Sequence, residues 1–254
     1  MRKLSMALLA GVALVGCGVD PQSENQEIIS NLVEAGFPAA DIQVIGDDVY
    51  VGNDAQVSLA ASREMLQPGK ESAEQYRTTN LVSSSVTKIC IIPTSQFNSY
   101  SRLSAGLDLA IENYNSQNLS FVMVRGSAAD CSATISAKTT SGTGGSAGFP
   151  TGGKPYGTIN IGVGLQNYSD DVNEHVITHE LGHCIGFRHS DYYDRSISCG
   201  GSASNEGASN VGAILIPGTP TDARVGGSIM NSCFRSTESG EWSSSDKTAL
   251  SYLY

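Results

Sequence analysis

The chain has 254 residues, of which 40% are hydrophobic and 16% are charged, and its formal net charge at pH 7 is −10. This composition is typical of a globular protein with room for one large domain, or for a catalytic domain with a small companion. The acidic balance and the lack of a basic stripe argue against nucleic acid as a partner, because nucleic-acid binders concentrate Lys and Arg.

The first residues have the features of an export signal. Two basic residues precede the apolar run MALLAGVALVG, which has signal-peptide length and is too short to span a bilayer as a mature helix. The run ends in LVGC, which is similar to the lipobox of bacterial lipoproteins. We therefore predict a signal peptide over residues 1–16 and lipid attachment at Cys17. An ordinary signal peptide with an incidental cysteine remains the alternative.

This start of the chain predicts a location. If Cys17 carries lipid, acyl chains alone attach the protein to a membrane, at the bacterial cell envelope or surface. Gly18 stands where an aspartate would suggest retention at the inner membrane, so the outer membrane is favoured. Secretion without an anchor is the other option.

Five further cysteines fit an oxidising compartment. We expect disulfides between Cys90 and Cys131 and between Cys199 and Cys233, which leaves Cys184 unpaired, although the sequence alone leaves other pairings open. The spacing lacks the close CxxC pairs of cysteine-based zinc ribbons, so we interpret these cysteines as cross-links.

Residues 17–80 are predicted to form a small αβ unit. Its helix ends near Gly36 and carries an apolar stripe of Ile28, Ile29, Leu32 and Val33. Residues 42–45 and 49–51 are predicted to be two short strands. Gly46-Asp47-Asp48 between them is predicted to be the turn of a hairpin. The polar stretch 68–80 has no core-forming periodicity and is the predicted domain boundary.

Residues 81–254 are predicted to form an α+β catalytic domain with a twisted, mostly parallel sheet, because strand, helix and strand follow one another as in a βαβ crossover. Residues 141–157 are rich in glycine and are expected to be a loop or an irregular edge strand. The expected elements are strands over 86–92, 119–124, 133–138 and 158–165, and helices over 103–114, 170–186 and 243–254.

All four histidines of the chain lie within residues 175–189. His179 and His183 are four residues apart, so on a helix their side chains project from one face and can reach one ion. Glu180 between them completes HExxH, in which two imidazoles bind zinc and the glutamate acts as general base on the water that zinc activates.

A catalytic zinc site needs a third protein ligand and one open position. Gly186 can leave the helix through a left-handed conformation and bring His189 back to the metal. HELGHCIGFRH thus fits H-E-x-x-H-x-x-G-x-x-H, the extended motif of the metzincins, at every specified position. Metzincins also have a methionine turn downstream, for which residues 228–231 supply Met230, although an ordinary core methionine would look the same.

The neighbouring polar residues are expected to have structural roles. His175 is expected to pack beside the site, because a fourth imidazole would close the open position. Cys184 points about 100° away from His183 around the helix, which favours the core or a disulfide. Asp191 and Asp194 are expected to cap loops.

The segments that surround the motif resemble the dual-action HEIGH metallopeptidases, a bacterial metzincin family. The similarity rests on residues 176–201, on IPGTPT (216–221) and on the final DKTALSYLY, and it extends upstream through residues 74–85. Leu181 replaces the isoleucine of the family name, a conservative exchange on the buried face of the helix.

The resemblance implies a zinc-dependent endopeptidase that acts on protein or peptide substrates. His179, His183 and His189 would bind one Zn²⁺ ion, and Glu180 would be the general base. Astacin-type metzincins have a tyrosine two residues after the methionine, whereas this chain has Ser232, so that oxyanion group is absent.

The resemblance also implies where a substrate binds. Metzincins bind peptide antiparallel to an edge strand of the upper sheet, which is expected here within residues 143–163. The N-terminal unit is a candidate prosegment that blocks the cleft, in which case Asp47 or Asp48 of the hairpin would reach the zinc.

Two other functions remain open. A catalytically silent envelope lipoprotein, used for adhesion or as a scaffold, could retain the zinc helix for stability alone. Glu180 and an open fourth position favour the enzyme, because a structural zinc site is normally closed by a fourth protein ligand. A zinc hydrolase of non-peptide amides would use the same ligands.

Overall fold

The computed structural model of the protein describes residues 21–66, 75–207 and 213–254. The predicted signal peptide, 1–16, and the predicted lipid site, Cys17, lie outside these ranges. Within them, no helix combines the length and the apolar character that a membrane crossing requires.

Helices and short strands alternate along the chain. In chain order the elements are α1 (Pro21–Glu34), β1 (Gln43–Ile45), β2 (Asp48–Val51), β3 (Ala55–Val57), α2 (Leu59–Glu64), β4 (Tyr76–Arg77), β5 (Lys88–Pro93), α3 (Ser95–Ser99), α4 (Ser101–Asn115), β6 (Val122–Arg125), β7 (Ala133–Thr140), β8 (Gly145–Gly148), β9 (Thr158–Gly162), the 3₁₀ helix η1 (Val163–Asn167), α5 (Asp170–Ile185), α6 (Ser196–Cys199), β10 (Ile214–Leu215) and α7 (Ser244–Leu253).

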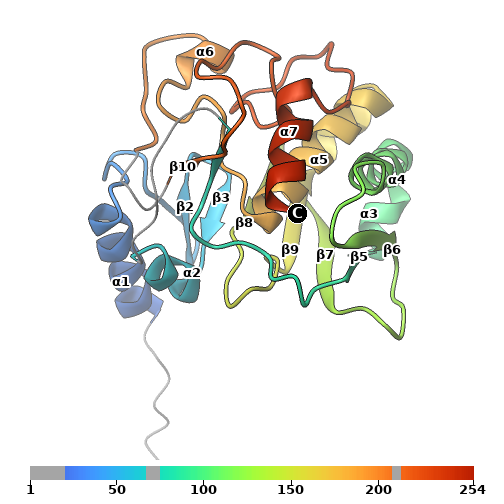
Figure 1. The fold of residues 1–254 in the computed structure, drawn as a ribbon, viewed down its shortest axis with the longest axis horizontal. Helices are drawn as coiled ribbons and strands as arrows, with labels where there is room; N and C mark the ends of the chain where they lie inside the picture. Colours follow the sequence, from blue (N-terminus) through green and yellow to red (C-terminus); the bar gives the residue numbers. More distant parts are fainter. Residues whose placement is uncertain (1–20, 67–74, 208–212) are drawn as a thin grey trace, which may run out of the picture.

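One mixed sheet runs through the molecule in the order β1-β2-β3-β8-β9-β7-β5-β6 (Figure 1). Strands β6, β5, β7 and β9 are mutually parallel, whereas β8 is antiparallel to β9. The N-terminal strands β1, β2 and β3 form an antiparallel meander that joins this sheet through parallel pairing of β3 with β8. The predicted fold class, a mostly parallel sheet with helices, is confirmed.

The glycine-rich segment 141–157 differs in part from the expectation. Most of it is bends, turns and irregular backbone, as expected, but residues 145–148 form strand β8, which is paired on both sides rather than lying at an edge. Small residues are needed there because a side chain at Gly148 would collide with the Gln56 carbonyl of β3 and with the ring of Tyr156. Strand β8, which lies within the range 143–163 where a substrate-binding edge was expected, is covered by β3.

The strand that was expected over residues 158–165 is also shorter than predicted. It ends at Gly162, where the chain turns into η1, in which Leu165 is buried in the core. The Leu165 carbonyl accepts a hydrogen bond of 2.9 Å from Asn173 Nδ2, which ties η1 to the first turn of α5.

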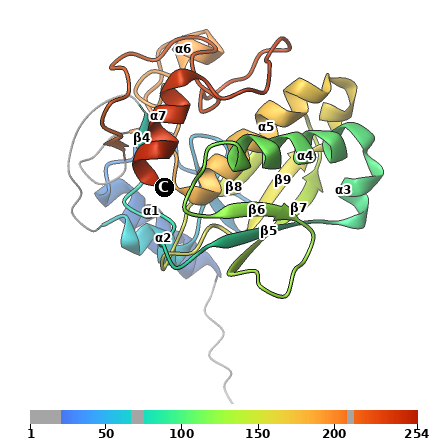
Figure 2. The ribbon, with the colours of Figure 1, turned by 45° about the vertical axis from the view of Figure 1, so that its right-hand side comes forward.

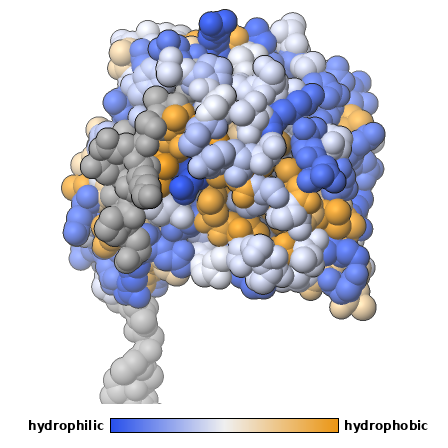
Figure 3. Space-filling view, viewed as in Figure 1, coloured by the Kyte–Doolittle hydropathy of each residue, from blue (hydrophilic) through white to orange (hydrophobic). Residues whose placement is uncertain are grey.

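Two apolar clusters form the core. The larger lies between the sheet and helices α4, α5 and α7, with Leu107, Ile177 and Leu250 fully buried. The smaller belongs to the N-terminal unit and includes Leu32 and Phe149, so a residue that follows β8 completes it. On the face drawn in Figure 3, polar residues predominate and apolar residues gather in the lower half.

Both expected disulfides are present. Cys90 of β5 is bonded to Cys131, and Cys199 of α6 is bonded to Cys233. Cys184 is a free, buried cysteine on α5, as expected. The second disulfide lies close to the candidate site and joins the α6 region to the segment that follows Met230.

Helices α4 and α5 lie side by side on one face of the sheet (Figure 2). A buried polar group links them: Asn113 Nδ2 donates to Glu174 Oε1 at 2.7 Å and to the Gly240 carbonyl at 2.8 Å. Burial, with the nearby charges of Glu241 and Asp171, raises the pKa of Glu174 from its ordinary 4.5 to about 7.

The pKa of Glu174 predicts a pH-dependent contribution to stability. A carboxyl whose pKa is raised by folding stabilises the native state below its unfolded pKa, and this contribution is lost as the pH rises through 7. We expect Glu174→Gln to become more stable relative to the wild type by about 1–3 kcal/mol between pH 4.5 and 8, the upper figure being the full value of a pKa raised from 4.5 to about 7. Paired urea unfolding at both pH values measures this difference, and a difference that does not change with pH would contradict it.

Candidate metal centre

The helix that carries the HExxH motif is fixed at both ends. Ser169 caps α5 by accepting a hydrogen bond of 3.2 Å from Val172 N, as expected. The helix ends at Gly186, which has a φ of 111°. A Cβ at this residue would also lie 2.6 Å from the Asn80 carbonyl oxygen, so only glycine fits the turn that leads to His189.

The structure brings together the three histidines of the motif. His179 and His183 project from α5, and His189 returns after the glycine turn; each is at most 6% exposed. His179 Nε2 lies 3.2 Å from His189 Nε2. Together with Asp54, these residues offer ligand atoms that all lie within 4.8 Å of one another.

In each of the three histidines, Nδ1 is the ring nitrogen that points away from the cluster, and it lies within hydrogen-bond distance of an oxygen. His179 Nδ1 lies 2.8 Å from the Ile229 carbonyl oxygen, and His183 Nδ1 lies 2.8 Å from that of Phe187. His189 Nδ1 lies 2.6 Å from Glu206 Oε1. With a proton on Nδ1 donated to each acceptor, all three Nε2 atoms present a lone pair to the same point.

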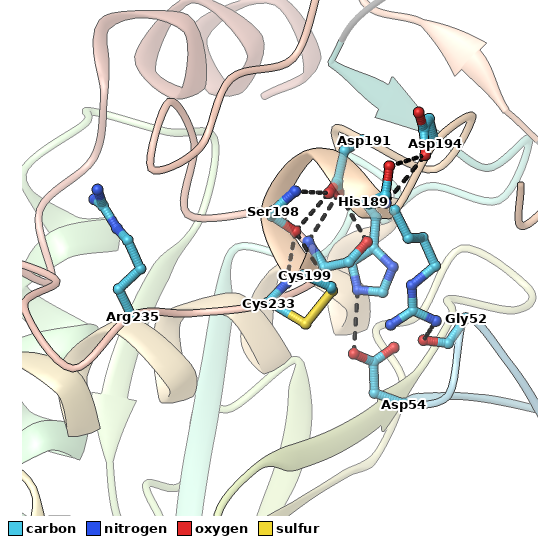
Figure 4. Close-up of a disulfide and its surroundings, with 12 residues drawn as sticks. Gly52, Asp54, His189, Asp191, Asp194, Ser198, Cys199, Cys233 and Arg235 are labelled. Atoms are coloured by element: carbon cyan, nitrogen blue, oxygen red, sulfur yellow. Dashed lines mark hydrogen bonds and ion pairs between the residues drawn. A yellow bond between two sulfur atoms is a disulfide. The ribbon is translucent and has the colours of Figure 1, made fainter. Parts of the chain in front are cut away.

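The carboxylate of the cluster comes from the turn between β2 and β3. Asp54 Oδ2 lies 3.1 Å from His189 Nε2 and 3.8 Å from His179 Nε2, and Asp54 Oδ1 lies 3.8 Å from His183 Nε2. Figure 4 shows Asp54 facing His189, with the Cys199–Cys233 disulfide beside them. The prediction that Asp47 or Asp48 would reach the metal was therefore wrong. Because β3 pairs with β8, the β2–β3 turn faces the histidines, whereas both of those aspartates are exposed in the β1–β2 hairpin.

A carboxylate faces the fourth position of the site. Three protein ligands and one open position were predicted for the active enzyme, and an aspartate of the N-terminal unit was expected at the metal if that unit is a prosegment. Asp54 supplies such a fourth donor, with its side chain 16% exposed. The N-terminal unit therefore completes the cluster as well as covering strand β8.

The donor set fits a divalent metal ion. Asp54 Oδ1 and His183 Nε2 are buried and have no hydrogen-bond partner among the described residues, although both lie in the cluster. Polar atoms buried without a partner are costly unless a ligand satisfies them. Three imidazoles and one carboxylate within this distance match the ligands that zinc prefers.

The charges of the site favour a cation. Burial alone would lower the pKa of His189, but the flanking carboxylates of Asp54 and Glu206 raise it to about 10. Burial would raise the pKa of Asp54, but the three histidines hold it well below its ordinary range. In contrast, burial and the neighbouring His179 hold the pKa of His183 well below its ordinary value.

Glu180 lies beside the cluster and is 2% exposed. Burial and the nearby Asp54 raise the pKa of its carboxyl well above the ordinary value, and its Oε2 has no hydrogen-bond partner in the described part of the chain. The residue lines a cavity of about 280 Å³ together with His179, Val176, Phe234 and Asp54. A reacting group in this cavity could therefore reach both the cluster and the Glu180 carboxylate.

Met230 lies beneath the helix between the two motif histidines. Its sulfur would be 2.6 Å from a Cβ at Gly182, so the turn can approach α5 only because Gly182 has no side chain. The Met230 carbonyl accepts a hydrogen bond of 2.7 Å from Ser190 N, next to His189. Asp246 at the start of α7 accepts from Ile229 N at 3.0 Å and holds the turn in place.

The remaining polar residues near the motif have largely structural contacts. Asp191 accepts from Ser198 Oγ at 2.5 Å and from Ser232 N at 2.9 Å, and Asp194 accepts from Ser196 N at 3.1 Å, so both cap loops as expected. His175 is buried, lies outside the cluster and lines the same cavity. Burial and His179 lower the pKa of His175 to about 4.

The sequence did not identify three carboxylates that lie at or near the site. Asp54, Glu206 and Asp246 stand in segments that read as ordinary turns or helix starts, and none has a motif spacing to HExxH. Asp54 and His189 are 135 residues apart in the sequence. Only the pairing of β3 with β8 brings Asp54 to the histidines.

A helix with HExxH, a glycine turn that presents a third histidine, and a methionine beneath them are the features of a metzincin-type metallopeptidase. The chain belongs to the dual-action HEIGH metallopeptidase family, whose sequence model matches residues 49–254.

Two solved structures, of myroilysin and of a hatching enzyme, are similar to this chain at low sequence identity. The chain is 17% identical to myroilysin, over 69% of this chain and 95% of that one, with a TM-score of 0.41. It is 17% identical to high choriolytic enzyme 1, a hatching enzyme zinc-protease from Oryzias latipes (medaka fish), over 70% of this chain and 98% of that one, with a TM-score of 0.40. No curated protein matches the chain.

Proposed function

We propose that the protein is a zinc-dependent endopeptidase that hydrolyses protein or peptide substrates. The observation that carries this proposal is the convergence of three Nε2 atoms, from His179, His183 and His189, beside the buried carboxylate of Glu180. The three histidines would hold one Zn²⁺ ion. When bound, zinc supplies Lewis acidity toward a water molecule and a peptide carbonyl.

The chain's own residues supply the proton transfers and the binding surface. Glu180 takes the proton of the attacking water and passes it to the leaving amine. Val176 and Phe234 line the cavity beside Glu180 and would receive an apolar substrate side chain. The backbone of β8 would pair with an extended peptide once its other edge is free.

We also propose that residues 17–80 are a prosegment that keeps the enzyme latent. In the described structure β3 pairs with the edge of β8 that an extended peptide would need, and Asp54 adds a fourth donor to the cluster. Release of this unit, by cleavage within the segment between α2 and β5, would free both. Residues 81–254 would then be the active peptidase domain.

A second candidate function is favoured by the same aspartate. A zinc site closed by four protein donors is typical of a structural role, so Asp54 is also compatible with a catalytically silent lipoprotein that uses zinc for stability alone. The two functions differ in one respect. A latent enzyme gains activity when the N-terminal unit is removed, whereas a structural protein only loses stability.

We propose further that the protein is exported and attached to the bacterial envelope by lipid on Cys17. The apolar run and LVGC at the start of the chain support this, and the two disulfides suit an oxidising compartment. Mass spectrometry of the mature N-terminus would detect both the lipid on Cys17 and any removal of the N-terminal unit.

Zinc content and casein cleavage test the proposed activity. We expect one zinc ion per chain, casein cleavage after limited proteolysis of the N-terminal unit, loss of cleavage with a chelator, and recovery when zinc is added back. A protein that binds zinc but cleaves no unfolded protein, in either its full-length or its trimmed form, would exclude the peptidase and favour the silent lipoprotein.

A further inference from the structure

A buried carboxylate outside the family motif touches the third histidine. Glu206 is 1% exposed, and its Oε1 lies 2.6 Å from His189 Nδ1, on the side of the ring that faces away from the cluster. The same carboxylate accepts a hydrogen bond of 3.2 Å from Ser232 Oγ, in the segment that follows Met230.

The three histidines differ in these outer partners. His179 and His183 each face a backbone carbonyl at 2.8 Å, which is a neutral acceptor, whereas His189 faces a carboxylate at a shorter distance. A charged acceptor makes the stronger hydrogen bond. It keeps the proton on Nδ1, leaves Nε2 free to bind an ion, and makes the imidazole a more basic ligand.

Two arginines also contact Glu206 and could give it a purely structural role. Arg195 Nε lies 3.3 Å from Oε1, and Arg188 Nη2 lies 3.5 Å from Oε2. Arg188 is buried and lies over the rings of Phe37 and Tyr192, at 4.6 Å and 5.2 Å. Both ion pairs are longer than the contact with His189, so the arginines offset the burial of the carboxylate while its shortest bond goes to the imidazole.

We propose that Glu206 is a positioning residue for the metal ion, acting through His189. This inference rests on the proposed zinc site. His189 follows a glycine turn rather than lying on a helix, so the rotation of its ring depends on an outside partner more than the rotation of His179 or His183 does. Glu206 supplies this partner and fixes the direction of Nε2.

The test is the dissociation constant of Zn²⁺, measured on the full chain by competition with a chromophoric chelator. Loss of a carboxylate behind a metal-binding histidine typically weakens metal binding 10- to 100-fold. We expect Glu206→Gln, which keeps an acceptor but loses the charge, to weaken zinc binding about 10-fold, and Glu206→Ala to weaken it toward 100-fold. Glu174→Gln removes another buried carboxylate near the site and should leave zinc binding unchanged.

A double-mutant cycle shows whether Glu206 acts through His189. In a His189→Ala background, Glu206→Gln should cause no further loss of zinc affinity. An equal loss in both backgrounds, or wild-type affinity in Glu206→Gln, would overturn the inference. Thermal unfolding without zinc identifies variants that fail to fold, and the isosteric glutamine variant carries the test if the alanine variant is among them.

The outcome also separates this inference from the proposed function. A wild-type chain that binds no zinc would overturn both. A chain that binds zinc tightly, shows the expected loss in Glu206→Gln and yet cleaves no protein would support the role of Glu206 and overturn only the peptidase.

Discussion

Replacing Glu180 with glutamine is expected to lower kcat/KM for peptide hydrolysis by about 10²- to 10⁴-fold, the usual contribution of a general base. Glutamine has the same shape but cannot accept the proton of the attacking water. Zinc binding should remain, because Glu180 does not belong to the cluster of four donor residues. Cleavage of a fluorescence-quenched peptide by the enzyme after removal of its N-terminal unit measures kcat/KM. Zinc analysis of each sample measures the bound metal.

Glu174→Gln is the matched control for this variant. It makes the same chemical change on the same helix, but Glu174 contacts Asn113 and lies outside the cluster of histidines. Its activity at pH 7 should stay within about twofold of wild type. If Glu180→Gln kept its zinc and more than a tenth of the wild-type activity, the glutamate would not be the general base.

The part of the site that the sequence predicts is the part that is local in the chain. His179, Glu180 and His183 are fixed by helical spacing, and Gly186 adds the turn to His189 within the same eleven residues. Backbone geometry alone therefore determines where these side chains meet. The same holds for α4, whose apolar spacing predicted the helix with boundaries within two residues.

Asp54 and β8 could not be predicted because long-range pairing determines both. An aspartate in the turn Gly52-Asn53-Asp54 has no pattern that distinguishes it from the exposed Asp47. Local propensity disfavours a strand over the glycines of 145–148, but pairing with β3 and β9 on both sides overrides it. The structure thus adds the two contacts on which the proposed latency rests, Asp54 beside the histidines and β3 beside β8.

Asp54→Ala distinguishes a latent enzyme from a structural zinc protein. If Asp54 inhibits the enzyme, the variant should bind zinc more weakly, because one donor is lost, and yet hydrolyse peptide faster than the full-length wild type at saturating zinc. We expect a gain of roughly 10- to 100-fold, which corresponds to about 1.4–2.8 kcal/mol for loss of the inhibitory Asp54 contact. Asp47→Ala, the same change in the neighbouring hairpin, should alter neither quantity.

The opposite directions of the two effects make the result informative. If Asp54 only stabilised a structural site, affinity and thermal stability would fall and no activity would appear, even after removal of the N-terminal unit. Because β3 still pairs with β8 in Asp54→Ala, the gain should be smaller than that from limited proteolysis between α2 and β5. Equal gains would mean that the aspartate alone causes latency, and a gain only after proteolysis would assign latency to the covered strand edge.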